Sequence, residues 1–154
     1  MRRRAGTSTS WSMATRTDAD DPPSYVDTSA LIAFLDRSDS FHPLFRRLFA
    51  SPPALITSPL VVAEGHGWFL RRYDRGRALQ FLAFIDALTP LKVLPLTRCE
   101  QDAAAAILRR FADQDLTLAD ALGLHLMAEH GCPRCWSTDF HLGLTGVPLA
   151  IHGT

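Results

Sequence analysis

Short apolar runs alternate with longer segments of helical periodicity from residue 25 onward. The short runs have the apolar, β-prone character of strands and cover 25–26, 54–57, 91–96, 133–137 and 147–151. The longer segments carry apolar residues on one helical face and cover 29–35, 41–49, 59–72, 79–88, 97–111 and 117–130, with a helical turn at 139–144. This alternation predicts an α/β fold, in which right-handed crossovers cover both faces of a mainly parallel sheet with helices.

Polar side chains that can cap a helix stand in front of several of these segments. The four predicted caps are Ser40, Ser58, Thr97 and Thr117. Pro59 directly after Ser58 strengthens the second of them, because proline suits the first turn of a helix. The last two caps have an acid three residues later, Glu100 and Asp120, and therefore predict capping boxes.

Residues 1–24 differ in composition from the remainder of the chain. Residues 1–17 contain four arginines, many serines and threonines and no acid, and two prolines end the stretch at 22–23. The absence of an apolar run excludes a secretory signal, while the composition resembles an organellar transit peptide. The alternatives are a disordered tail or an upstream start codon, with Met13 as the true start. We expect the folded domain to occupy 25–154.

Composition narrows the class of protein without selecting a function. The 154 residues are 47% hydrophobic and 21% charged, as in a single globular domain. No run approaches the ~18 apolar residues of a membrane-spanning helix. Three cysteines do not suit a secreted disulfide scaffold, so we expect a reducing compartment such as the cytoplasm. The formal net charge of +0 excludes a strongly basic coat for nucleic acid.

Four carboxylates occupy positions just after predicted strands or in the first turns of helices. Asp27 follows the first strand, Asp139 follows the fourth, and Glu64 and Asp120 lie near helix starts. In open α/β sheets, the carboxyl ends of the strands gather ligands, so these acids are expected at one edge. Clustered carboxylates repel unless a cation lies between them. An oxygen-only set suits Mg²⁺ or Mn²⁺ and favours phosphodiester hydrolysis.

A purely structural role is open for each acid. Asp27, Asp120 and Asp139 could each serve as a helix-capping residue and have no further role. Glu64 could be an ordinary exposed helix residue. However, Gly65 and Gly67 beside it each cost the helix about 1 kcal/mol relative to alanine, which suggests close approach by another backbone or a ligand.

Four short motifs together resemble the PIN-domain nucleases, and more narrowly the VapC-type toxins of bacterial toxin–antitoxin pairs. The motifs are V-D-T-S-A-L at 26–31, L-V-V-A-E at 60–64, L-T-L-A-D-A at 116–121 and S-T-D at 137–139. Each motif alone is weak evidence, but their order and spacing are fairly specific. The resemblance covers about residues 25–151. The N-terminal extension departs from the family, whose toxins usually begin a few residues before the first aspartate.

The resemblance implies a three-layer α/β/α fold with a five-stranded parallel sheet and an acidic pocket that binds Mg²⁺ or Mn²⁺. Asp27 and Asp120 match the positions that hold the metal most directly, and Glu64 and Asp139 would complete the catalytic pocket. The hydroxyls of Thr28 and Thr138 would brace the carboxylates or the scissile phosphate. Family members cut RNA, typically form homodimers and are silenced by a cognate antitoxin. A catalytically idle PIN-like scaffold that binds RNA or protein is the alternative.

Arginines and cysteines provide further candidate sites. The densest basic cluster contains Arg71, Arg72, Arg75 and Arg77. It could contact RNA phosphates, or be only a solvated helix end. The pair Cys132 and Cys135, with His125 and His130, leaves a structural zinc site open. Several aromatic residues in the helices, Phe41 and Trp68 among them, are candidates for a dimer or antitoxin surface.

Overall fold

The computed structural model describes residues 21–153. The first twenty residues of the expected extension lie outside the described part, and Ser24 is already the first residue of a strand. The strands are β1 (Ser24–Val26), β2 (Leu55–Thr57), β3 (Leu91–Val93) and β4 (Cys135–Trp136). The helices are α1 (Thr28–Leu35), α2 (His42–Leu48), α3 (Pro59–Arg72), α4 (Arg75–Ala87), α5 (Arg98–Arg110) and α6 (Leu118–Glu129). Two short 3₁₀ helices follow, η1 (Phe140–Gly143) and η2 (Ala150–His152).

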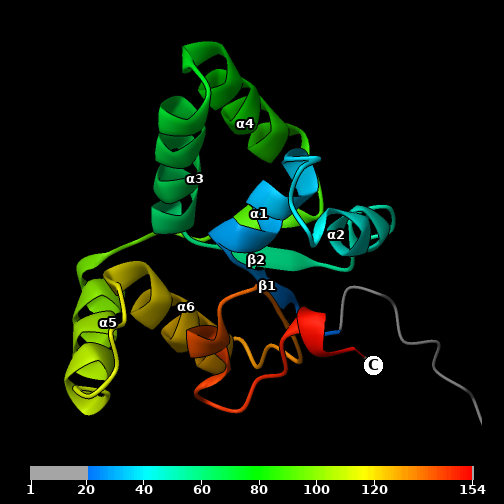
Figure 1. Cartoon of the computed structure of the whole chain (residues 1–154). Coiled ribbons are helices and arrows are strands. Elements are labelled where there is room, and N and C mark those ends of the chain that lie inside the picture. The colour runs from blue at the N-terminus through cyan, green and yellow to red at the C-terminus, as the bar shows by residue number, and fades with distance from the viewer. Residues whose placement is uncertain (1–20, 154) are drawn as a thin grey trace, which may run out of the picture.

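The four strands form one parallel sheet in the order β3-β2-β1-β4. The chain moves outward from β1 through β2 to β3 and then returns to the other side of β1. Right-handed crossovers therefore place α1 to α4 on one face of the sheet and α5 and α6 on the other, as Figure 1 shows. This arrangement confirms the predicted α/β fold. It also places the topological switch point between β1 and β4. In such sheets, ligands bind at the carboxyl ends of the strands beside this point.

The fifth strand predicted at 147–151 is reduced to one isolated parallel bridge between Cys135 and Leu149. The Cys135 amide donates to the carbonyl of Pro148 at 2.9 Å. Pro148 has no N–H to donate in return, which limits pairing along this segment. From Ala150 the chain turns into η2. The sheet is thus parallel as expected, with four strands and a single bridge where the fifth was expected.

Most predicted helix starts are confirmed by the cap geometry. Ser58 Oγ accepts from the Val61 amide at 3.3 Å, and both predicted capping boxes are complete. Ser40 is the exception, because α2 has no side-chain cap and begins after Phe41. Instead, Asp39 Oδ1 accepts the Phe41 amide at 2.8 Å. An aspartate turn therefore precedes the helix and takes the place of the predicted serine cap.

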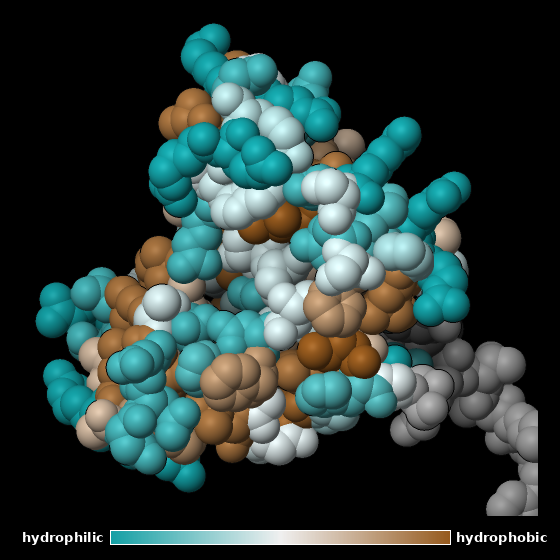
Figure 2. Space-filling view, viewed as in Figure 1, coloured by the Kyte–Doolittle hydropathy of each residue, from teal (hydrophilic) through white to brown (hydrophobic). Residues whose placement is uncertain are grey.

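The core lies between the sheet and its two helical layers. Its largest fully buried side chains include Tyr25, Phe45, Phe81, Leu122 and Leu124. Phe49 and Phe69 are also buried, whereas Phe41 is at the surface. Among residues 21–153, no helix has the length and apolar character needed to cross a membrane. On the face drawn in Figure 2, apolar and hydrophilic residues intermix, and the surface is hollowed between α3 and the α5–α6 pair.

Candidate active site

Asp27 lies at the carboxyl end of β1, where it caps α1. Its Oδ2 accepts three hydrogen bonds, from the Ser29 amide at 3.2 Å, Ser29 Oγ at 2.7 Å and Ser137 Oγ at 3.0 Å. Only 8% of the residue is exposed. Burial raises the pKa of the Asp27 carboxyl, although the hydrogen bonds from Ser29 and Ser137 oppose the shift. The capping role is therefore real, and among the described residues it leaves Oδ1 available for a ligand.

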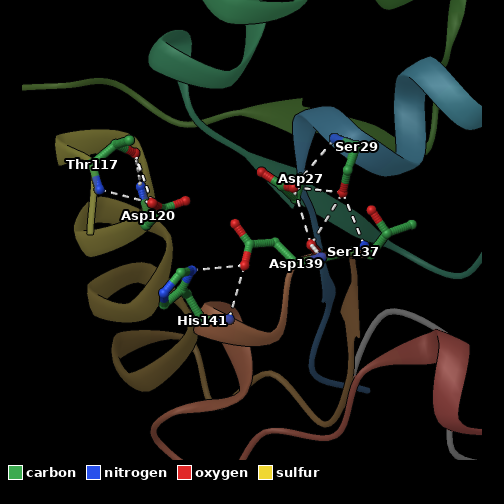
Figure 3. A network of polar contacts seen from close by, with 8 residues as sticks. Asp27, Ser29, Thr117, Asp120, Ser137, Asp139 and His141 are labelled. Carbon is green, nitrogen blue, oxygen red and sulfur yellow. Dashed lines mark hydrogen bonds and ion pairs between the residues drawn. The ribbon is translucent and has the colours of Figure 1, made fainter. Parts of the chain in front are cut away.

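Two serines tie the end of β1 to the end of β4, as Figure 3 shows. Ser29 Oγ accepts the Thr138 amide at 2.9 Å, and Ser137 Oγ accepts the Asp139 amide at 2.9 Å. The two hydroxyls are 3.1 Å apart. The sequence interpretation missed these serines, although both lie inside the motifs at 26–31 and 137–139. Thr138 is held by its backbone amide, and its hydroxyl makes no hydrogen bond within the described residues.

Glu64 reaches the same place from the second turn of α3. Thr28 Oγ1 donates to Glu64 Oε2 at 2.9 Å, which agrees with the bracing role expected of Thr28. The residue is solvent-accessible, but its carboxyl is partly shielded. This partial burial raises the pKa of Glu64, the charges of Asp27 and Asp120 raise it further, and the Thr28 hydrogen bond opposes the shift. The carboxylate of Glu64 therefore interacts electrostatically with the carboxylates of Asp27 and Asp120.

Asp120 uses only one of its oxygens for the capping box of α6. Oδ2 accepts the amide and the hydroxyl of Thr117, both at 2.8 Å, while the Asp120 amide donates to Thr117 Oγ1 at 3.1 Å. In Figure 3 the carboxylates of Asp120, Asp27 and Asp139 turn toward a common space beside the ends of β1 and β4. Asp120 therefore caps α6 and at the same time lies near the other acids.

Asp139 follows β4 and caps η1. Its Oδ1 accepts the His141 amide at 2.9 Å and also lies 2.9 Å from His141 Nδ1. The ring of His141 in turn lies against the exposed ring of Phe140 in a tilted arrangement, with 4.1 Å between the ring centroids. The structure thus brings Asp27, Glu64, Asp120 and Asp139, here called the acidic cluster, to one edge of the sheet.

The four carboxylates of the acidic cluster are oxygen donors of the kind that Mg²⁺ and Mn²⁺ prefer. Within the described part of the chain, no lysine or arginine forms an ion pair with any of its four carboxylates. Equally, no group of three or more His, Cys, Asp or Glu among residues 21–153 is close enough to hold an ion directly. Mg²⁺ commonly takes one or two carboxylates and keeps several waters, so a hydrated ion does not require three protein ligands.

The glycines beside Glu64 leave room for side chains. A Cβ on Gly65 would collide with the ring of Phe81, so Gly65 allows α3 and α4 to pack closely. A Cβ on Gly67 would lie 3.1 Å from Arg71 Nη1. The close approach suggested by the sequence is therefore made by side chains of the protein itself.

Arg71 and Arg72 point in different directions from the end of α3. Arg71 follows Glu64 by seven residues, two helical turns, and so lies on the same face; its guanidinium folds back over Gly67. The Arg72 guanidinium instead lies 5.2 Å from the ring centroid of Tyr73. Of the two predicted RNA contacts, Arg71 is the one directed along α3 toward the acidic cluster.

Cys132 and Cys135 are buried free thiols. Burial raises the pKa of Cys132 to about 11 and raises that of Cys135 as well. Within residues 21–153, these thiols are not part of any group of three or more His, Cys, Asp or Glu that could hold zinc. His125 and His130 are instead close to Glu129.

Comparison with known proteins identifies the family. The family model described as "PIN domain" matches residues 24–143. The Mycobacterium tuberculosis toxin VapC20, which cleaves the sarcin–ricin loop, has a similar structure, with a TM-score of 0.73 and 25% sequence identity. The match covers 80% of this chain and 95% of VapC20.

Two further structures share the fold at 18% identity. A Pyrobaculum aerophilum protein matches with a TM-score of 0.58. The match covers 85% of this chain and 91% of that protein. A chain of a Klebsiella pneumoniae toxin–antitoxin complex matches with a TM-score of 0.56. The match covers 82% of this chain and 94% of that chain. No curated protein matches the sequence.

Proposed function

This chain belongs to the PIN domain family, and on that premise we propose that it is a metal-dependent endoribonuclease, the toxin of a toxin–antitoxin pair. The observation that carries the proposal is the meeting of Asp27, Glu64 and Asp120 from three distant segments. Burial raises the pKa of Asp27 and of Glu64, and repulsion by the charges of Asp27 and Asp120 raises that of Glu64 further. A divalent cation relieves that repulsion, which gives the cluster a physical reason to bind one.

The side chains of the cluster have distinct roles in this proposal. Asp27 and Asp120 hold Mg²⁺ or Mn²⁺ most directly, and Glu64 and Asp139 complete the site. When bound, such an ion polarises the phosphate and activates water for attack on the phosphodiester. The protein fixes the carboxylates beforehand: Ser29 and Ser137 hold Asp27.

RNA is held by the surroundings of the cluster. Arg71 binds a phosphate along α3, Arg72 adds positive charge at the end of that helix, and the hydroxyl of Thr138 contacts the scissile phosphate. The bracing of Glu64 by the Thr28 hydroxyl keeps that carboxylate in place. Since the net charge is +0, binding depends on local arginines and should weaken steeply with salt.

The relatives support a choice of substrate and partners to test. VapC20 is described as a sarcin–ricin loop cleaving toxin, so that ribosomal RNA loop is the first substrate to test. The complex from K. pneumoniae supports an antitoxin partner. Large exposed apolar side chains on the α3–α4 pair, Leu70, Tyr73 and Leu79, support a protein-covered surface for a homodimer or the antitoxin. The free thiols suit the cytoplasm.

The test compares two matched variants on RNA cleavage. Asp27→Asn removes the buried carboxylate charge, and Asp36→Asn removes the charge of a partly exposed aspartate in a second turn of the same kind. We expect the wild type and Asp36→Asn to cut RNA with Mn²⁺ or Mg²⁺ and to leave 5′-phosphates. Asp27→Asn, or wild type with EDTA, should not cut.

Cleavage that survives Asp27→Asn would reject the acidic cluster as the active site. If the wild type cuts no RNA under any metal condition but binds RNA or an antitoxin tightly, the idle scaffold is the better description.

A further inference from the structure

Phe140 has the most exposed large apolar side chain among residues 21–153. It is 67% exposed, whereas the next in order, Leu70, is 45% exposed. Phe140 is the first residue of η1 and directly follows Asp139 of the acidic cluster. Apolar surface is unfavourable in water, so a ring held out beside the cluster is a candidate contact for whatever binds there.

His141 joins the Phe140 ring to the acidic cluster. The two ring centroids are 4.1 Å apart, and the ring planes are inclined by 32°. The same imidazole is fixed by Asp139, whose Oδ1 lies 2.9 Å from His141 Nδ1, as Figure 3 shows. Only the imidazole therefore separates the Phe140 ring from the Asp139 carboxylate, and a chain molecule bound at the cluster has the ring within reach.

An open hollow of about 360 Å³ adjoins the Phe140 ring. Its lining includes Gly146, Val147, Leu149 and His152. Gly146 has a φ of +89°, a left-handed conformation that favours glycine. The hollow is within the roughly 300–1,000 Å³ of small-ligand sites and, like them, combines apolar walls with a polar group. A flat aromatic group laid on Phe140 would have room there.

We propose that Phe140, backed by His141, is the platform on which an unpaired base of the RNA stacks beside the scissile phosphate. Every base has a π face, so stacking tolerates any base that is free of pairing. Proteins that bind RNA commonly stack the unpaired bases of loops and single strands on such rings. The substrate class is therefore single-stranded or loop RNA. This inference rests on the proposed function, because it requires RNA to lie at the acidic cluster.

The position of the ring favours a base over a protein partner. Phe140 flanks the carboxylates, where the phosphates of the substrate would lie. The exposed apolar side chains assigned above to a protein-covered surface are instead on the α3–α4 pair. A second copy of the chain or another protein over Phe140 is therefore an alternative that the experiment must exclude.

The test measures binding of a fluorescein-labelled single-stranded RNA by anisotropy in EDTA, where the proposed nuclease does not cut. Phe140→Ala should weaken binding about 10-fold, as loss of one stacked base does. Phe140→Leu keeps an apolar side chain without a π face and should also bind more weakly, whereas Phe140→Trp should bind as tightly as the wild type. The matched control is Phe41→Ala, because Phe41 is also exposed but precedes α2; it should bind as the wild type does. A fully paired RNA duplex should bind equally to all five proteins.

Cleavage kinetics with Mn²⁺ distinguish stacking from a structural effect on the cluster. Phe140→Ala should raise KM about 10-fold and leave kcat unchanged, because stacking stabilises the bound substrate and the transition state alike. A fall in kcat at unchanged KM would mean that the ring acts only by holding Asp139, and the inference would be overturned.

The remaining outcomes separate this inference from the proposed function. If Phe140→Ala binds and cuts single-stranded RNA as the wild type does, the platform is overturned and the nuclease stands. If RNA binding depends on Phe140 but the wild type cuts no RNA with any divalent metal, the nuclease fails while recognition of a base by the ring stands. If the wild type binds no RNA, both fall. If RNA binding is unchanged and Phe140→Ala instead converts a dimer to a monomer in sedimentation, a second copy covers the ring and the inference is overturned.

Discussion

Two local motifs each occur twice in this protein, once at the acidic cluster and once at the surface. Asp27 and Asp36, on either side of α1, each accept the amide and the hydroxyl of the serine two residues later. The hydroxyl distances are 2.7 Å for Asp27 and 2.6 Å for Asp36. Yet burial raises the pKa of Asp27, whereas the hydrogen bond from Ser38 lowers that of Asp36.

The capping boxes of α5 and α6 repeat this contrast. In both, the threonine amide donates to the acid three residues later, at 2.9 Å to Glu100 and 2.8 Å to Asp120. Glu100 is partly exposed, and the hydrogen bond from Thr97 lowers its pKa. Asp120 instead lies close enough to Glu64 to raise that residue's pKa. Identical local chemistry therefore acquires a different electrostatic role when other segments pack around it.

The largest expected effect distinguishes the two capping boxes. Asp120→Asn removes one carboxylate charge from the acidic cluster and should slow RNA cleavage by at least about 100-fold, as loss of one preorganised electrostatic group at an active site does. Glu100→Gln alters the matching box outside the cluster and should leave the rate unchanged. Initial rates on the same RNA, with Mn²⁺ in excess, provide the measurement. Equal rates for both variants would remove Asp120 from the proposed site.

A smaller effect separates the serines of the two aspartate turns. Ser29→Ala removes the donor to Asp27 and the acceptor of the Thr138 amide, and should cost about 1–3 kcal/mol of unfolding free energy. Ser38→Ala removes the equivalent exposed contact and should change stability by no more than about 0.5 kcal/mol. Urea denaturation of both variants in EDTA measures the difference. Equal losses would mean that burial does not distinguish the turns.

The smallest expected effect is a difference in the sign of pH dependence. The Asp27 pKa is raised from 3.8, so its contribution to stability is present below that value and is lost as pH rises through the native pKa. The Asp36 pKa is lowered, so its contribution is present above 3.8 and is lost as pH falls. With metal removed, rising pH should make Asp27→Asn more stable relative to the wild type and Asp36→Asn less stable.

Unfolding free energies of the three proteins across about pH 3 to 7 test this sign. Parallel curves for the two variants would contradict the opposite pKa shifts. Saturating Mn²⁺ should abolish the advantage of Asp27→Asn, because the cation then compensates the wild-type charge.

Local sequence signals predicted much of the fold because they act over a few residues. Ser58 with Pro59, and the two threonine boxes, mark helix starts that the structure has at those positions. The signal at Ser40 was wrong, because Asp39 forms the competing turn. The strand expected at 147–151 depended on pairing with a distant segment, and Pro148 limits that pairing.

The sequence by itself determined the order of strands and helices along the chain and most of the caps, since each follows from periodicity or from hydrogen bonds between near neighbours. The four acids were singled out by their positions near predicted strand ends and helix starts and by the family resemblance of their motifs. The tertiary structure alone decided that burial dominates the pKa of Asp27 while a hydrogen bond dominates that of Asp36, and that Ser29 and Ser137 join the ends of β1 and β4. Desolvation and charge repulsion depend on which remote segments surround a group, and only the packed chain specifies that.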